Sequence, residues 1–142
     1  MKEILIALMI WIGANTNYNI DVPLPPIQFK TQVEMESLYY GKQRKGEGEL
    51  YGFYNLKKNI IILPDTWDST RPFDLGLLLH EVIHYLQDIN DVQFGCVAEM
   101  EFDAWPLQKQ YLENVHSFHW EYDGLWHFMI SQCSPNDEFW TN

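Results

Sequence analysis

The residues of this chain best suited to chemistry form the run His-Glu-Val-Ile-His that begins at residue 80. His80 and His84 are four residues apart, a spacing that puts both imidazoles on one face of an α-helix. Two such imidazoles can bind one zinc ion at distances of about 2.0–2.1 Å. Glu81 lies beside them and could take a proton from a water molecule that the metal activates. The run therefore predicts a zinc site with its own general base.

The residues around this run predict the helix that must position it. Apolar residues recur at the helical period, at Leu75, Leu78, Leu79, Val82, Ile83, Leu86 and Ile89. This pattern indicates a buried helix from Leu75 to Ile89, followed by a turn at Asn90-Asp91. His80, His84 and Gln87 form a polar stripe on that helix. A solvated helix face that happens to carry two histidines is the other interpretation, but the apolar flanks favour burial, and buried polar groups need partners.

A second acidic segment, Glu101-Phe102-Asp103-Ala104-Trp105, follows on another predicted helix. With the first motif it resembles the gluzincins, zinc peptidases whose third ligand is a glutamate on the helix after the His-Glu-x-x-His helix. The short chain, Gln87 and Gln108 are similar to the small bacterial and phage metallopeptidases called minimal gluzincins. The resemblance covers about Tyr51 to Glu113.

This resemblance implies one zinc ion per chain, with Glu101 as the third protein ligand beside His80 and His84. Glu101, Ala104 and Gln108 share one helical face, which is consistent with that role. Glu99 is the alternative ligand. Asp103 is expected to accept a hydrogen bond from the second ring nitrogen of a ligand histidine. The other interpretation of these carboxylates is a solvated acidic face, which is the usual fate of such a run.

Two predicted strands precede the metal helix. Glu49–Tyr54 and Asn59–Leu63 are rich in aromatic and β-branched residues and are joined by a short polar turn, which predicts a hairpin. Either strand could pair with an extended peptide substrate. Gly41–Gly48 is expected to form an exposed loop. The expected fold class is α+β: a small zincin-like domain whose short sheet, with its hairpin, packs on the metal helix and the glutamate helix.

Composition limits the partners and the number of domains. The chain has 142 residues, of which 46% are hydrophobic, and its net charge is −11. Residues 15–142 are expected to form one domain. The acidic balance excludes nucleic acid, because binding to phosphates depends on lysine and arginine. A neutral or basic peptide or protein substrate fits this charge better.

The N-terminal segment and the two cysteines leave the compartment open between export and the cytoplasm. Residues 1–14 have the length of a signal-peptide apolar region, but Glu3 and Ile12 depart from that pattern. The alternative is a helix or strand buried in the core, since the segment is too short for a membrane span of about 20 residues. Cys96 and Cys133 are expected to be bonded if the chain is exported and to be thiols otherwise.

The function expected from these residues is hydrolysis of peptide bonds by a zinc-activated water, with Glu81 as general base. Any one of His116, His119, Tyr122 and His127 could stabilise the oxyanion. The other interpretation is a structural or surface role, which is more common for a histidine in an aromatic-rich segment. Two alternatives remain: a metal-dependent hydrolase of another amide or ester, and a non-catalytic binding protein of the same fold whose metal is structural or absent.

Overall fold

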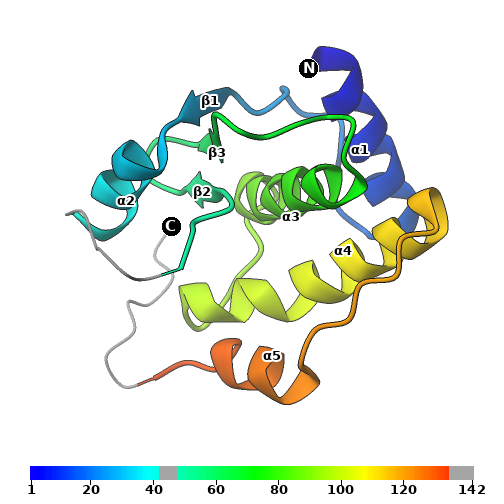
Figure 1. The fold of residues 1–142 in the computed structure, drawn as a ribbon. Helices are drawn as coiled ribbons and strands as arrows, with labels where there is room; N and C mark the ends of the chain where they lie inside the picture. The colour runs from blue at the N-terminus through cyan, green and yellow to red at the C-terminus, as the bar shows by residue number, and fades with distance from the viewer. Residues whose placement is uncertain (42–47, 135–142) are drawn as a thin grey trace.

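A computed structural model describes residues 1–41 and 48–134 (Figure 1). Within them the chain forms five α-helices, one 3-10 turn and a three-stranded sheet, which is an α+β arrangement as expected. The elements in chain order are α1 (Lys2–Asn15), β1 (Ile27–Lys30), α2 (Gln32–Tyr40), β2 (Phe53–Asn55), β3 (Ile60–Pro64), α3 (Pro72–Ile89), η1 (Val97–Met100), α4 (Glu101–His116) and α5 (Gly124–Ile130). The loop predicted at Gly41–Gly48 lies, apart from its two end residues, outside the described residues.

The sheet has the strand order β1-β3-β2. β2 and β3 pair antiparallel, which confirms the predicted hairpin, although β2 covers only Phe53–Asn55 of the predicted first strand. The turn is stabilised by the Asn55 side chain, which accepts the backbone N–H groups of Lys57 and Lys58 at 3.1 Å. β1 pairs parallel with β3, a partner that the sequence analysis did not predict. Consequently β3 is the central strand and β2 forms one edge.

The central strand is apolar because both faces of the sheet are covered. Ile61 and Leu63 belong to the main hydrophobic core. Ile62 points to the other face, where it packs with Met35 of α2 and with Phe53. Alternate residues of a strand point to opposite faces, so an uninterrupted apolar run is what a doubly covered strand requires.

The metal helix of the sequence analysis is α3, which begins three residues before the expected start and ends at the predicted residue, Ile89. Pro72 occupies its first turn, a position where proline costs no hydrogen bond. The Asp74 carboxylate accepts the backbone N–H of Asp68 at 2.9 Å and pairs with Arg71 at 2.9 Å. These contacts anchor the loop that leads from β3 into α3.

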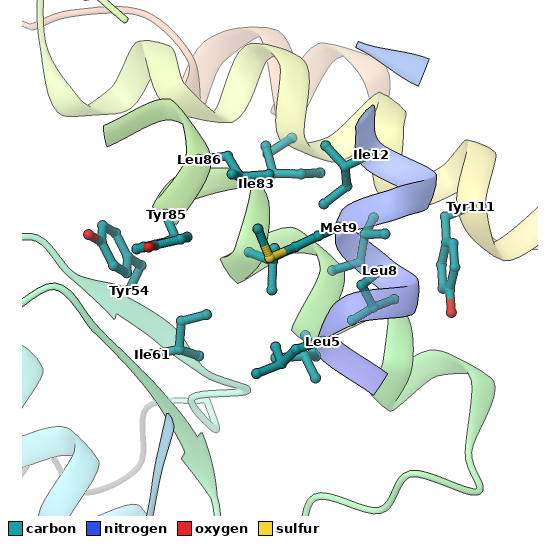
Figure 2. Close-up of a cluster of buried hydrophobic side chains, with 14 of the residues drawn as sticks. Leu5, Leu8, Met9, Ile12, Tyr54, Ile61, Ile83, Tyr85, Leu86 and Tyr111 are labelled. Atoms are coloured by element: carbon teal, nitrogen blue, oxygen red, sulfur yellow. The ribbon is translucent and has the colours of Figure 1, made fainter. Parts of the chain in front are cut away.

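The N-terminal helix α1 belongs to the main core. Leu5, Leu8, Met9 and Ile12 are buried, and Figure 2 shows them directed toward side chains of α3 such as Ile83 and Leu86. The sequence analysis gave two interpretations of residues 1–14, a signal peptide and an element buried in the core. In this structure these residues form part of a helix that packs in the core. Among residues 1–41 and 48–134, no helix combines the length and apolar character that crossing a membrane requires.

α4 packs closely along α3 (Figure 1). Ala104 is fully buried between them. A methyl group at Gly76 would come within 2.9 Å of the Leu112 side chain. Small residues on both helices thus allow the close approach that brings their polar stripes together.

A disulfide joins Cys96, just before η1, to Cys133, just after α5. The bond connects the segment that leads into α4 with the segment that follows α5, and α5 packs beside α4 (Figure 1). The compartment-dependent prediction about these cysteines stays a prediction, but their placement fits the bonded alternative.

Candidate metal centre

Three potential metal ligands meet where α3 and α4 pack together. The Nε2 atoms of His80 and His84 lie 3.0 Å apart. Glu101 Oε1 is 3.0 Å from His84 Nε2, and Oε2 is 3.0 Å from His80 Nε2. Neighbouring ligand atoms in a tetrahedral zinc site with bonds of about 2.0–2.1 Å lie about 3.3 Å apart. The three side chains could hold a metal ion with little rearrangement.

Two glutamines determine which nitrogen of each histidine faces this point. Gln87 donates its Nε2–H to the Met100 carbonyl at 3.1 Å, so its Oε1 is the atom that meets His84 Nδ1 at 2.9 Å. An amide oxygen only accepts, and His84 Nδ1 must therefore carry the proton. Gln108 Oε1 lies 2.9 Å from His80 Nδ1, so with this oxygen as the acceptor His80 Nδ1 carries the proton as well. The buried Gln108 Nε2 has no hydrogen-bond partner among the described residues. In their neutral forms both histidines thus direct the unprotonated Nε2 at Glu101.

With both histidines neutral, acceptor atoms converge here with no donor between them. Two imidazole lone pairs and a carboxylate face one another in a largely buried site, and such groups repel unless a cation lies between them. A proton can fill that place in the metal-free protein. Imidazole nitrogen and carboxylate oxygen are also the ligand types that zinc accepts, so the donor set fits the ion predicted from the sequence.

The pKa values of the metal-free site reflect the same need for a cation. Burial lowers the pKa of His84, but the charge and hydrogen bond of Glu101 outweigh it and raise that pKa to about 9. Burial raises the pKa of Glu101, but the two imidazoles outweigh it and hold that pKa well below its usual value. At neutral pH the site therefore contains a protonated His84 beside an ionised Glu101.

Glu81 is buried next to this centre and faces the sheet. Its carboxylate accepts the backbone N–H of Tyr54 in β2, and burial raises its pKa more than the nearby histidines lower it. Tyr54 is in turn fixed at the other end of its side chain, where its hydroxyl donates to Asp88 Oδ2 at 2.6 Å. A carboxyl group with a raised pKa and a fixed position is suited to accepting and returning a proton.

The centre opens into a cleft of about 840 Å³. Residues 50–54, which include the start of the edge strand β2, line it on the sheet side, and α5 with the preceding segment lines it on the other. Most of the lining is apolar and much of it aromatic, with rings contributed by Tyr39, Tyr51, Phe73, Trp105, Trp120, Tyr122 and Trp126. Of the two predicted hairpin strands, the one that borders the cleft is β2.

The structure separates the other acidic candidates from the centre. The Glu99 carboxylate accepts the backbone N–H of Gly95 at 2.7 Å and lies in a group with Cys96 and Cys133. Asp103 lines a separate, smaller pocket with Glu99. The expectation that Asp103 would hold a ligand histidine is therefore wrong, because Gln87 and Gln108 occupy both Nδ1 positions. Glu99 belongs to η1 and Asp103 to the first turn of α4, and neither residue lines the cleft that contains Glu101.

The four oxyanion candidates fall in different places. Tyr122 lines the cleft. His127 is buried behind Glu101 and donates its Nε2–H to the Glu101 carbonyl at 2.9 Å. His116 contacts the hydroxyl of Tyr111, and His119 is exposed beside Glu113 and Glu121. Only Tyr122 of this set borders the space above the three ligands.

The sequence analysis did not assign roles to the residues that hold the ligands. Trp105 donates its indole N–H to Glu101 Oε2 at 2.8 Å. Gln87 follows His84 by three residues, and Trp105 follows Glu101 by four, and such pairs are neighbours on a helix surface. That spacing was the available signal for both contacts.

Comparison with known proteins assigns this chain to a family. Residues 1–139 match a family described as a domain of unknown function, DUF6647, and the chain belongs to that family. No curated protein and no solved structure matches it. The matched residues include α1, the two ligand-bearing helices α3 and α4, and α5.

Proposed function

We propose that this protein is a zinc-dependent hydrolase of peptide bonds that binds one zinc ion per chain through His80, His84 and Glu101. The observation that carries the proposal is the convergence of four acceptor atoms from three side chains, with neighbouring atoms 3.0 Å apart. Because Gln87 holds the proton of neutral His84 at Nδ1, the Nε2 atom of that form directs a lone pair at this point. A gluzincin-like, zincin-type fold is part of the proposal, supported by two ligand-bearing helices beside an edge strand.

A bound zinc ion would supply a Lewis acid that polarises the substrate carbonyl and lowers the pKa of water to about 7. Glu81 is suited to take the proton from the attacking water and to return it to the leaving amine nitrogen. Its burial beside the two histidines keeps that proton close to the reacting atoms. Its hydrogen bond from the Tyr54 N–H keeps the carboxylate from rotating away.

The cleft supports a peptide as substrate. β2 is an edge strand, so its outer side could pair with an extended main chain by strand addition. The apolar lining would hold substrate side chains, and Tyr122 has a hydroxyl suited to the developing oxyanion. Each of these residues borders the same cleft as Glu81 and the three ligands.

The experiment compares wild type with Glu81→Gln, since this change keeps the size of the side chain and removes the base. Zinc content should stay near one per chain, while turnover of a peptide library should fall by about 10²-fold or more. Glu99→Gln is the matched control, because Glu99 lies outside the site, and it should cleave like wild type. Equal turnover in Glu81→Gln would refute the mechanism. A zinc-loaded wild type that cleaves ester or other amide substrates but no peptide would move the substrate class to those compounds.

A further inference from the structure

The third ligand, Glu101, is the least constrained of the three by its own position in the fold. It is the first residue of α4, directly after the 3-10 turn η1, and its side chain is 29% exposed, against 12% and 9% for His80 and His84. A long side chain at a helix end has several rotamers, and ordering it costs free energy. Other residues must therefore hold the carboxylate against the histidines.

Trp105 meets this need at the carboxylate. Its indole N–H lies 2.8 Å from Glu101 Oε2, the oxygen that also faces His80 Nε2. A hydrogen bond from a neutral donor to a carboxylate is charge-assisted and therefore stronger than a neutral pair. Because the indole is a donor only, it cannot compete with the carboxylate for a cation. The contact fixes the carboxylate in the orientation in which both oxygens face imidazole nitrogens.

His127 acts on the backbone of the same residue. It is buried in α5 and donates its Nε2–H to the Glu101 carbonyl at 2.9 Å. Its ring also stacks on Trp105, with 5.3 Å between ring centroids and 26° between the planes. One aromatic pair thus holds Glu101 at the main chain and at the carboxylate together.

We infer that Trp105 and His127 are positioning residues for the metal ligand Glu101, so that α5 is a functional part of the metal centre as well as a wall of the cleft. This inference rests on the proposed function, since it assigns a role toward the same zinc ion. Neither residue touches the reacting atoms in this assignment. Their effect is on the affinity for the metal.

The test measures zinc affinity by competition with a chelator in Trp105→Phe and His127→Phe. Both changes keep an aromatic ring and remove the N–H donor. Loss of a partner that orients a metal ligand typically costs about 10–100-fold in metal affinity, and that loss is expected here. The melting temperature of the zinc-free variants should stay near that of wild type, which separates positioning from a general loss of structure.

Two matched controls are available. Trp120→Phe changes another tryptophan of the cleft that contacts the Trp105 ring, with centroids 6.1 Å apart. His116→Phe changes a histidine that contacts Tyr111 instead. Both should bind zinc within about 3-fold of wild type, well inside the loss expected for an orienting residue. Wild-type affinity in both Trp105→Phe and His127→Phe would overturn the inference and leave the proposed function standing.

A second measurement needs no metal. In the zinc-free protein the indole N–H resonance of Trp105 should be protected from exchange with water, and Glu101→Ala should remove that protection. An unprotected indole N–H in wild type would overturn the inference directly. A wild type that binds no zinc, with His84→Ala indistinguishable from it, would overturn the proposed function and the inference together.

Discussion

Two groups of residues in the described part of the chain have the types of side chain that bind metals, and only one is suited to do so. His80, His84 and Glu101 form the first group; Cys96, Glu99 and Cys133 form the second. Within each group the potential ligand atoms lie within 4.8 Å of one another. In the second, however, the two sulfurs are bonded to each other and Glu99 accepts the Gly95 N–H. Residue types and proximity are therefore insufficient to identify a metal site. The bonding partners of each potential ligand atom decide whether that atom is available to a metal.

The first group directs the two histidine Nε2 atoms and the Glu101 carboxylate at one another. The side-chain oxygens of Gln87 and Gln108 each accept a hydrogen bond from a histidine Nδ1–H, so Nε2 is the acceptor atom of each neutral ring. The second group uses its atoms to join two segments. One group is thus a candidate metal centre and the other a structural crosslink, and the following predictions test that contrast.

The largest expected effect is the loss of zinc when a ligand of the first group is removed. His84→Ala and Glu101→Ala should each lower the zinc content from about one per chain to nearly none, because a catalytic site depends on three protein ligands. Elemental analysis of the purified proteins measures this. Glu99→Ala is the control and should keep its zinc. If Glu99→Ala alone lost zinc, the contrast between the two groups would be reversed.

Removal of the crosslink should affect stability rather than metal content. The disulfide closes a loop with a sequence separation of 37, and the chain-entropy relation gives about 4 kcal/mol for a loop of that size. The double variant Cys96→Ser/Cys133→Ser should lose about this much unfolding free energy in urea and still bind one zinc ion. Loss of zinc at full stability would instead make the cysteines part of a metal site.

The largest pH dependence of the zinc-free protein above neutral pH should come from His84 of the first group. The pKa of His84 is raised from 6.5 to about 9, so its contribution to stability is fully present below about pH 6.5 and is lost as the pH rises through 9. The decrease is on the order of 3 kcal/mol. Urea unfolding of zinc-free protein between pH 6 and pH 10 would detect it.

The control for this measurement is Glu101→Gln, which removes the negative charge that raises the His84 pKa. In that variant the decrease above pH 6.5 should disappear. Saturating zinc should also abolish it in wild type, because the metal takes the place of the proton. A decrease that persisted in Glu101→Gln would have to come from other groups.

The smallest effect is expected from Gln87, which connects the two ligand helices. Its side chain joins His84 on α3 to the Met100 carbonyl just before Glu101. Gln87→Leu should weaken zinc binding by about 10-fold, the lower end of the usual range for such partners. Gln93→Leu is the matched control, because the Gln93 side chain contacts only Asp91 among the hydrogen bonds of the structure. Equal affinities would show that the Gln87 contact is dispensable.

The sequence by itself determined the elements whose signals are local. The apolar period around His80 predicted α3 and its last residue, and two runs rich in aromatic and β-branched residues around a polar turn predicted the β2–β3 hairpin. His80, Glu81 and His84 were identified by spacing within one helix. Both the helical and the extended period repeat within a few residues, so these features need no knowledge of the rest of the chain.

Only the tertiary structure decided which atoms face one another. The parallel pairing of β1 with β3, the core position of α1 and the contact of α5 with Glu101 each join segments distant in sequence. The choice of Gln108 over Asp103 as the α4 partner of a ligand histidine also depended on how α4 packs on α3. A side chain's hydrogen-bond partner is set by distances of a few tenths of an ångström, and packing between helices, rather than the order of residues along either one, fixes distances on that scale.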